Sequence, residues 1–140
     1  MSQATLIGTS SEHWVKFTTP EGLDAYTFTG IVLISFKGEG PQIERTNLAF
    51  EIPLPSDFPA NGALRLRHWA AYVGLSAMAN DKAAMDVLWA VDNFNLLQPE
   101  SLQRGKLKVN CGLAVRDIDG WILHLGYMVQ VLGLTEIVGF

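Results

Sequence analysis

Cysteine and charge are both scarce in this chain. The 140 residues include a single cysteine, so no disulfide can form within the chain. Charged residues make up 17% of the sequence, below the quarter that is usual in globular proteins, whereas hydrophobic residues make up 49%. A domain of this composition has more apolar surface than a monomer hides easily. The composition therefore favours association with other copies of the chain, or a ligand groove.

Basic clusters and long apolar runs are also missing. The ten lysine and arginine residues are scattered and the net charge is −4, which argues against nucleic acid as a partner. No apolar run reaches the length of a transmembrane helix, so no membrane span is predicted. Residues 1–5 have neither the basic nor the apolar region of a signal peptide. These features favour a cytoplasmic protein, or a component of a particle that is assembled inside the cell.

Alternation of apolar and polar residues is the clearest feature that is present. Apolar side chains fall on odd positions in residues 107–115, and residues 121–131 keep the same parity. A period of two is typical of strands with one buried face. Gly120, just before the second stretch, suits the third position of a hairpin loop. We therefore predict an antiparallel hairpin in which Leu113 pairs with Leu125.

Weaker alternation predicts further strands along the rest of the chain. They are expected at residues 5–8, 14–18, 26–36, 43–54 and 64–75, with a turn at 20–22. Residues 76–91 are ambiguous, and we favour a turn at 80–82 followed by a strand at 85–97. The chain is thus expected to form one all-β domain over residues 1–140, an antiparallel β-sandwich or jelly-roll of about eight strands. A β-barrel, or an α+β fold with one helix near residues 80–92, is the alternative.

No group of residues forms a catalytic or metal-binding motif. His13, His68 and His124 are far apart and lack the spacing of metal ligands, so neither a metal nor another cofactor is predicted. Cys111 lies on the apolar side of its predicted strand, and we expect a small buried side chain, not a nucleophile. The sequence favours a protein that is not an enzyme, although residues from several strands can form an active site without a local motif.

The back of the predicted hairpin is the first candidate site. Its pairing places Gly112 opposite Gly126, which leaves a strip poor in side chains that something could approach closely. The residues that form or border this strip are Asn110, Gly112, Arg116, Ile122, His124, Gly126 and Met128. Another segment of the same chain, a second subunit or a small ligand would each fit it.

A cluster of aromatic and polar residues is the second candidate site. It consists of Trp89, Asp92, Asn93 and Asn95. Sugar-binding sandwiches use carboxylates and amides for the hydroxyl groups and aromatic rings for the apolar sugar face. A purely structural role, with Trp89 in the core and Asp92 in a bend, is the competing interpretation.

Taken together, these patterns favour a structural or interaction subunit that assembles into a homo-oligomer or a larger particle. Ile122, Met128 and Leu132 are predicted on an outer face that a monomeric sandwich normally keeps polar. The C-terminal residues 137–140 add further apolar surface. A carbohydrate-binding or small-ligand-binding module is the alternative function.

Overall fold

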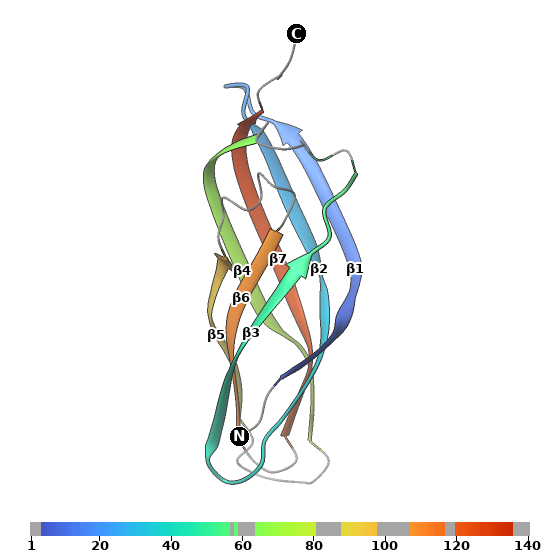
Figure 1. The fold of residues 1–140 in the computed structure, drawn as a ribbon, viewed down its shortest axis with the longest axis vertical. Coiled ribbons are helices and arrows are strands. Elements are labelled where there is room, and N and C mark those ends of the chain that lie inside the picture. Colours follow the sequence, from blue (N-terminus) through green and yellow to red (C-terminus); the bar gives the residue numbers. More distant parts are fainter. Residues whose placement is uncertain are drawn as a thin grey trace.

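In the computed structural model, the chain forms two antiparallel β-sheets packed face to face (Figure 1). The structure describes residues 4–56, 58, 64–80, 88–97, 107–116 and 120–135. The strands in these residues are β1 (Thr5–Thr18), β2 (Asp24–Lys37), β3 (Ile43–Ile52), β4 (Leu64–Asn80), β5 (Leu88–Leu97), β6 (Leu107–Arg116) and β7 (Gly120–Thr135). Sheet A has the order β1-β2-β7-β4, and sheet B has the order β3-β6-β5. The predicted antiparallel β-sandwich is confirmed, with seven strands described and with neither a closed barrel nor a helix in the described residues.

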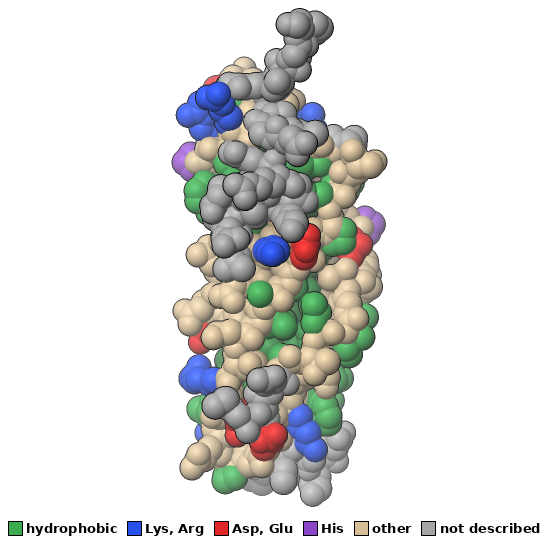
Figure 2. All heavy atoms as spheres, in the orientation of Figure 1, with side chains coloured by type: hydrophobic (Ala, Val, Ile, Leu, Met, Phe, Trp, Pro, Cys, Tyr) green, Lys and Arg blue, Asp and Glu red, His purple; other side chains and the backbone are tan. Residues whose placement is uncertain are grey.

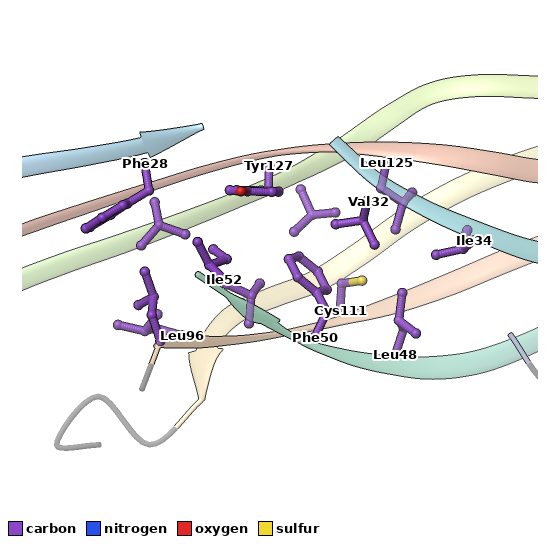
Figure 3. Packing of buried hydrophobic residues seen from close by; sticks show 14 of the residues in the cluster. Phe28, Val32, Ile34, Leu48, Phe50, Ile52, Leu96, Cys111, Leu125 and Tyr127 are labelled. Carbon is purple, nitrogen blue, oxygen red and sulfur yellow. The ribbon is translucent and has the colours of Figure 1, made fainter. Parts of the chain in front are cut away.

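Alternating side chains of the two sheets meet in a continuous core. In β2 the apolar positions from Tyr26 to Phe36 face inward, as the sequence predicts. Burying each such side chain contributes about 1.5–3 kcal/mol, so neither sheet would be stable without the other. Figure 3 shows the two layers of side chains: Phe28, Val32, Ile34, Leu125 and Tyr127 from sheet A, and Leu48, Phe50, Ile52, Leu96 and Cys111 from sheet B.

The predicted hairpin is wrong, because its two arms belong to different sheets. Strand β6 pairs with β3 and β5, whereas β7 pairs with β2 and β4. Leu113 therefore lies beside Thr46 and Val91, and Leu125 lies beside Val32. Both leucines are buried as predicted, but they contribute to the core from opposite layers. The alternation reveals which face of a strand is buried, and it does not identify the neighbouring strand.

The predicted alternation of inward and outward residues in β7 is wrong near the start of the strand. Ile122 was expected on the outer face and is fully buried. The pairing of β7 with both neighbouring strands shifts between Ile122 and His124, leaving Leu123 without a partner in either register. An extra residue of this kind is a β-bulge, and it reverses the faces of the strand beyond it. From Leu125 to Val131 the buried side chains again fall on odd positions.

The remaining strand predictions are confirmed with different bounds. The two short strands expected before residue 19 form the single strand β1. The turn at residues 20–22 is present, and the backbone N–H of Gly22 donates a hydrogen bond to the carbonyl oxygen of Thr19. Residues 88–91 are strand and not helix, whereas residues 81–87 of the ambiguous segment lie outside the described residues. Gly120 begins β7 instead of ending a loop, and residues 118–119 of that loop lie outside the described residues.

The two sheets pack together along one edge and separate along the other. Strand β4 packs beside β5, where the rings of Tyr72 and Phe94 lie 5.8 Å apart. On the opposite side, between β1 and β3, hydrophobic side chains are visible at the surface (Figure 2). Lys16 covers part of this open edge, with its ammonium nitrogen 5.7 Å from the centre of the Tyr26 ring.

Candidate functional site

The strip predicted behind the hairpin is divided between opposite sides of the molecule. Gly126 pairs with Ile31 and Gly74 in sheet A, whereas Gly112 pairs with Asn47 and Asp92 in sheet B. His124, Gly126 and Met128 lie on the outer face of sheet A. Asn110, Gly112 and Arg116 lie on the outer face of sheet B. Ile122 is buried in the core. The two glycines therefore cannot form one strip.

Sheet A has an outward face without formal charge across all four strands. We define the outer A face by residues that share this side in the observed register: Gly8, Ser10, His13, Val15 and Phe17 of β1; Ala25, Thr27, Thr29, Ile31 and Leu33 of β2; His124, Gly126, Met128, Gln130 and Leu132 of β7; and His68, Ala70, Tyr72, Gly74 and Ala77 of β4. None of these residues is Lys, Arg, Asp or Glu. Lys37 lies beyond one end of the face, and Arg65 and the exposed Arg67, which falls in the register shift between Leu66 and His68, lie at the other end.

The side of the outer A face that is formed by β7 and the edge strand β4 has a ridge beside a groove. Met128 pairs with Tyr72, and these side chains are 40% and 55% exposed. In the adjacent row, Gly126 pairs with Gly74, and a Cβ atom added to either glycine would meet no atom within 4 Å. A cavity of about 380 Å³ opens further along the sheet, beside Phe17 and Leu132 among others. The face is thus uneven enough to fit a specific partner surface.

Sheet B has a charged outward face with a polar hollow. The outer B face consists of Ile43, Arg45, Asn47, Ala49 and Glu51 of β3; Lys108, Asn110, Gly112, Ala114 and Arg116 of β6; and Leu88, Ala90, Asp92 and Asn95 of β5. Asp92 lies over Gly112, because a Cβ atom added to that glycine would be 2.4 Å from Asp92 Oδ1. Arg45 Nη1 is 3.6 Å from Asp92 Oδ2. These side chains line a hollow of about 250 Å³ together with Asn47 and Asn93.

The structure separates the residues of the predicted sugar-binding cluster. Asp92 and Asn93 line the hollow, and Asn93 has a φ of 51° beside an irregularity in the β5–β6 pairing. Trp89 instead packs against the core, and its indole nitrogen has no hydrogen-bond partner among the described residues. Asn95 Oδ1 accepts a hydrogen bond of 2.8 Å from the backbone N–H of Leu96. The hollow therefore has polar groups but lacks the predicted aromatic ring.

A third site, at the open edge between β1 and β3, was not predicted. Its buried end is Tyr127, whose hydroxyl has no hydrogen-bond partner among the described residues. Burial raises the pKa of Tyr127 to about 12, and the negative charge of Glu12 adds to this effect. A cavity of about 210 Å³ lies here, lined by Glu12, Trp14, Pro53 and Tyr127 among others.

Two irregular strand segments create this edge site. The β1–β2 pairing shifts between Ser10 and His13, and Ser11 has a φ of 53°. This β-bulge lies opposite Gly30, where an added Cβ atom would be 2.4 Å from the Tyr127 hydroxyl oxygen. The glycine thus leaves the space that the phenol occupies. The signal in the sequence was Gly30 itself, a glycine within the otherwise apolar inward series of β2.

Other functional chemistry has little support in the described part of the chain. No three or more His, Cys, Asp and Glu side chains there are arranged to hold a metal ion. Cys111 is buried as expected, and desolvation, followed by the charge of Asp92, raises its thiol pKa to about 11. Among the described residues there is no helix with the length and hydropathy that a membrane crossing requires. Comparison with family models, with curated proteins and with solved structures finds no significant match to this chain.

Proposed function

We propose that this protein is a structural subunit that associates with copies of itself through the outer A face. The observation that carries the proposal is the absence of formal charge across four adjacent strands of an outward surface. Sheets that face water normally alternate apolar inward residues with polar outward ones, and charged residues are depleted at the centres of interfaces. A surface with these properties is suited to contact with protein.

A second copy of the chain fits this face because the face is complementary to itself. A two-fold axis between the two central rows would seat Met128 and Tyr72 of one copy on Gly126 and Gly74 of the other, and the reverse. Four strands about 4.8 Å apart, over about ten residues each, cover roughly 600 Å² per copy. This area is close to the roughly 800 Å² per partner of a standard stable interface.

The winding of the strands supports assembly into a particle larger than a dimer. Strand β2 pairs with β7, β3 pairs with β6, and β4 packs beside β5. Strands β2 to β4 therefore lie beside strands β5 to β7 in reverse order, as the two arms of one long hairpin would. We propose that the sandwich is a jelly-roll on the basis of this arrangement. Jelly-roll domains include capsid subunits, in which the same fold is repeated many times.

Sedimentation velocity of three proteins over a range of concentrations tests the proposal. We expect the parent to be oligomeric, and Met128→Lys to be largely monomeric because it would bury an unpaired ammonium group. Ala49→Lys, on the exposed outer B face, is the matched control and should sediment like the parent. A parent that stays monomeric throughout would refute the proposal.

A second variant separates loss of the interface from loss of the fold. A Cβ atom added to Gly126 would have no atom of the described residues within 4 Å, so Gly126→Val should fold normally while filling the groove that the partner's Met128 needs. We expect a monomer with an unchanged thermal midpoint at low protein concentration. An intact oligomer in both Gly126→Val and Met128→Lys would show that the subunits meet through another surface.

The hollow on the outer B face supports carbohydrate binding as a second candidate function. Asp92 carries a carboxylate and Asn93 an amide, which are the groups that proteins use for sugar hydroxyls. Titration of the parent and of Asp92→Ala with a panel of monosaccharides, followed by amide chemical shifts, tests this function. We expect shifts around Gly112 that saturate in the parent and are weakened in the variant. Shifts that are equal in both proteins would argue against this site.

A further inference from the structure

A buried hydroxyl without a partner marks the edge site between β1 and β3 as a binding site. Tyr127 is 4% exposed, and its hydroxyl finds no hydrogen-bond partner among the described residues. Phenylalanine would pack in the same space without leaving a polar atom unpaired, so the buried hydroxyl lowers the stability of the fold when no ligand is bound. Tyr127 also lines the cavity of about 210 Å³ at this edge. A bound molecule would supply the missing partner.

The surrounding residues hold the hydroxyl at the cavity. The ring of Tyr127 packs against Phe50, with 5.7 Å between the ring centres. Gly30 leaves room for the hydroxyl, and the β-bulge of β1 opposite Gly30 brings Glu12 to the same cavity. The hydroxyl of Thr9 donates a hydrogen bond to Glu12 Oε1, which orients the carboxylate. β-Bulges commonly redirect a side chain in this way beside binding sites.

The chemistry of the lining selects a cationic ligand. Among the described lining residues, Glu12 is the single Asp, Glu, Lys or Arg, and His13 is the one histidine, so at neutral pH the negative charge of Glu12 disfavours a carboxylate or phosphate ligand. Trp14 and Phe28 add aromatic rings, whose faces attract cations. A cavity of about 210 Å³ corresponds to roughly seven water molecules at about 30 Å³ each, which suits a ligand of about eight non-hydrogen atoms.

We propose that the edge site binds a small organic ammonium compound that carries one apolar ring. The ammonium group would donate hydrogen bonds to the Glu12 carboxylate and to the Tyr127 hydroxyl oxygen. The apolar ring would pack against Trp14 and the prolines at the end of β3, Pro53 and Pro55. Glu12, Trp14 and Tyr127 do not belong to the outer A face, although His13 of that face also lines the cavity.

Three probes of similar size and different charge test the proposal. Benzylamine, benzyl alcohol and benzoate would be titrated into the protein at pH 7, and the indole N–H signal of Trp14 followed by NMR. We expect a saturable shift with benzylamine and affinities at least about tenfold lower for the alcohol and the acid. Equal affinity for benzylamine and benzyl alcohol, or no saturable shift with benzylamine, would overturn the proposal.

Three variants connect the binding to the named groups. Glu12→Gln and Tyr127→Phe should each lower the benzylamine affinity, by at least about tenfold for Glu12→Gln, whereas Glu39→Gln, an exposed loop residue, should not. Glu12 is exposed, so its variant should fold, and Tyr127→Phe should melt no earlier than the parent because it removes an unpaired hydroxyl. Unchanged benzylamine affinity in Glu12→Gln would overturn the assignment.

Discussion

The outer faces of the two sheets differ in charge although both inner faces are apolar. The outer B face carries Arg45, Glu51, Asp92, Lys108 and Arg116, whereas the outer A face has no Lys, Arg, Asp or Glu. On sheet B the observed register places Glu51 opposite Lys108, so opposite charges are neighbours. Charged side chains are scattered over the face shown in Figure 2.

The inner faces of the sheets serve folding, whereas the outer faces are the surfaces that can contact other molecules. Folding requires only that the inner faces be apolar, and the core includes no buried polar or charged residue among those described. The outer faces are not constrained by the fold, so their composition reports what each face contacts. On the outer B face, the exposed Arg45 and Asp92 lie beside Ala114 and Gly112, which are buried. The lack of charge makes the outer A face costly to leave exposed to water.

Substitutions on the inner faces should cause the largest losses in the free energy of unfolding, and these losses should be similar for both sheets. Leu113 of sheet B and Leu125 of sheet A are each at most 1% exposed. Truncation of either to Ala should lower the free energy of unfolding by about 2–5 kcal/mol, through lost burial and the cavity left behind. Urea denaturation at one protein concentration measures both. A loss below about 1 kcal/mol for one of them would mean that its sheet is not packed as described.

Alanine substitution of glycines on the inner and outer faces of sheet A should have smaller, and different, effects on the free energy of unfolding. Gly30→Ala should lower the free energy of unfolding by about 1–3 kcal/mol, because the new methyl group would overlap the buried ring of Tyr127. Gly126→Ala on the outer face should change it by less than about 0.5 kcal/mol, or raise it slightly, since alanine is less flexible than glycine. Urea midpoints measured under conditions where both are monomeric would test this contrast. Equal losses would contradict the assignment of the two faces.

The strands could be predicted from the sequence because alternation is a local property. The inward series of β2 and the buried odd positions of β6 follow directly from it. The pairing of β6 and β7 could not be predicted in the same way, because two strands close in sequence can pair or can lie in different sheets with the same alternation. The bulge at Leu123 was also hidden, since both Ile122 and Leu123 are apolar and either could be buried.

The candidate sites depend on neighbours from distant strands, and so they were only partly predictable. Met128 and Gly126 were correctly identified as outward residues, but their partners Tyr72 and Gly74 come from β4. The edge site requires a bulge in β1, a glycine in β2 and a tyrosine in β7, and no local motif connects them. Register across a sheet is the information that the sequence alone did not supply.

The stability of the fold should depend on pH through Asp24 of β2, which is hydrogen-bonded to β1 and β7 at one end of sheet A. Asp24 accepts hydrogen bonds from Thr135, at 2.5 Å, and from Thr18, at 3.0 Å, and the Thr135 bond is the main cause of its lowered pKa. A carboxyl group with a lowered pKa stabilises the fold above its unfolded pKa of about 3.9, and this contribution is lost as the pH falls through the folded value.

The variant Asp24→Asn tests this contribution directly. It should lower the free energy of unfolding by about 1 kcal/mol at pH 7, because the hydrogen bonds to a charged acceptor are weakened in a partly exposed place. The difference from the parent should shrink as the pH falls below about 4. Thermal denaturation at pH 7 and at pH 2.5 compares the two proteins. A difference that stays constant over this range would show that the charge of Asp24 is not what stabilises the fold.

The smallest effect should come from the ion pair on the outer B face. The side chains of Arg45 and Asp92 are 65% and 50% exposed, and their nearest charged atoms are 3.6 Å apart. Exposed pairs are screened by water and salt, so a double-mutant cycle with Arg45→Ala and Asp92→Ala should give a coupling of about 0–0.5 kcal/mol that disappears in 1 M NaCl. Such a result would confirm that charge on this face keeps it solvated and does not stabilise the fold. A coupling above about 1 kcal/mol would instead indicate that the polar hollow over Gly112 is rigid, because only a fixed geometry makes an exposed pair that strong, and carbohydrate binding there would gain support.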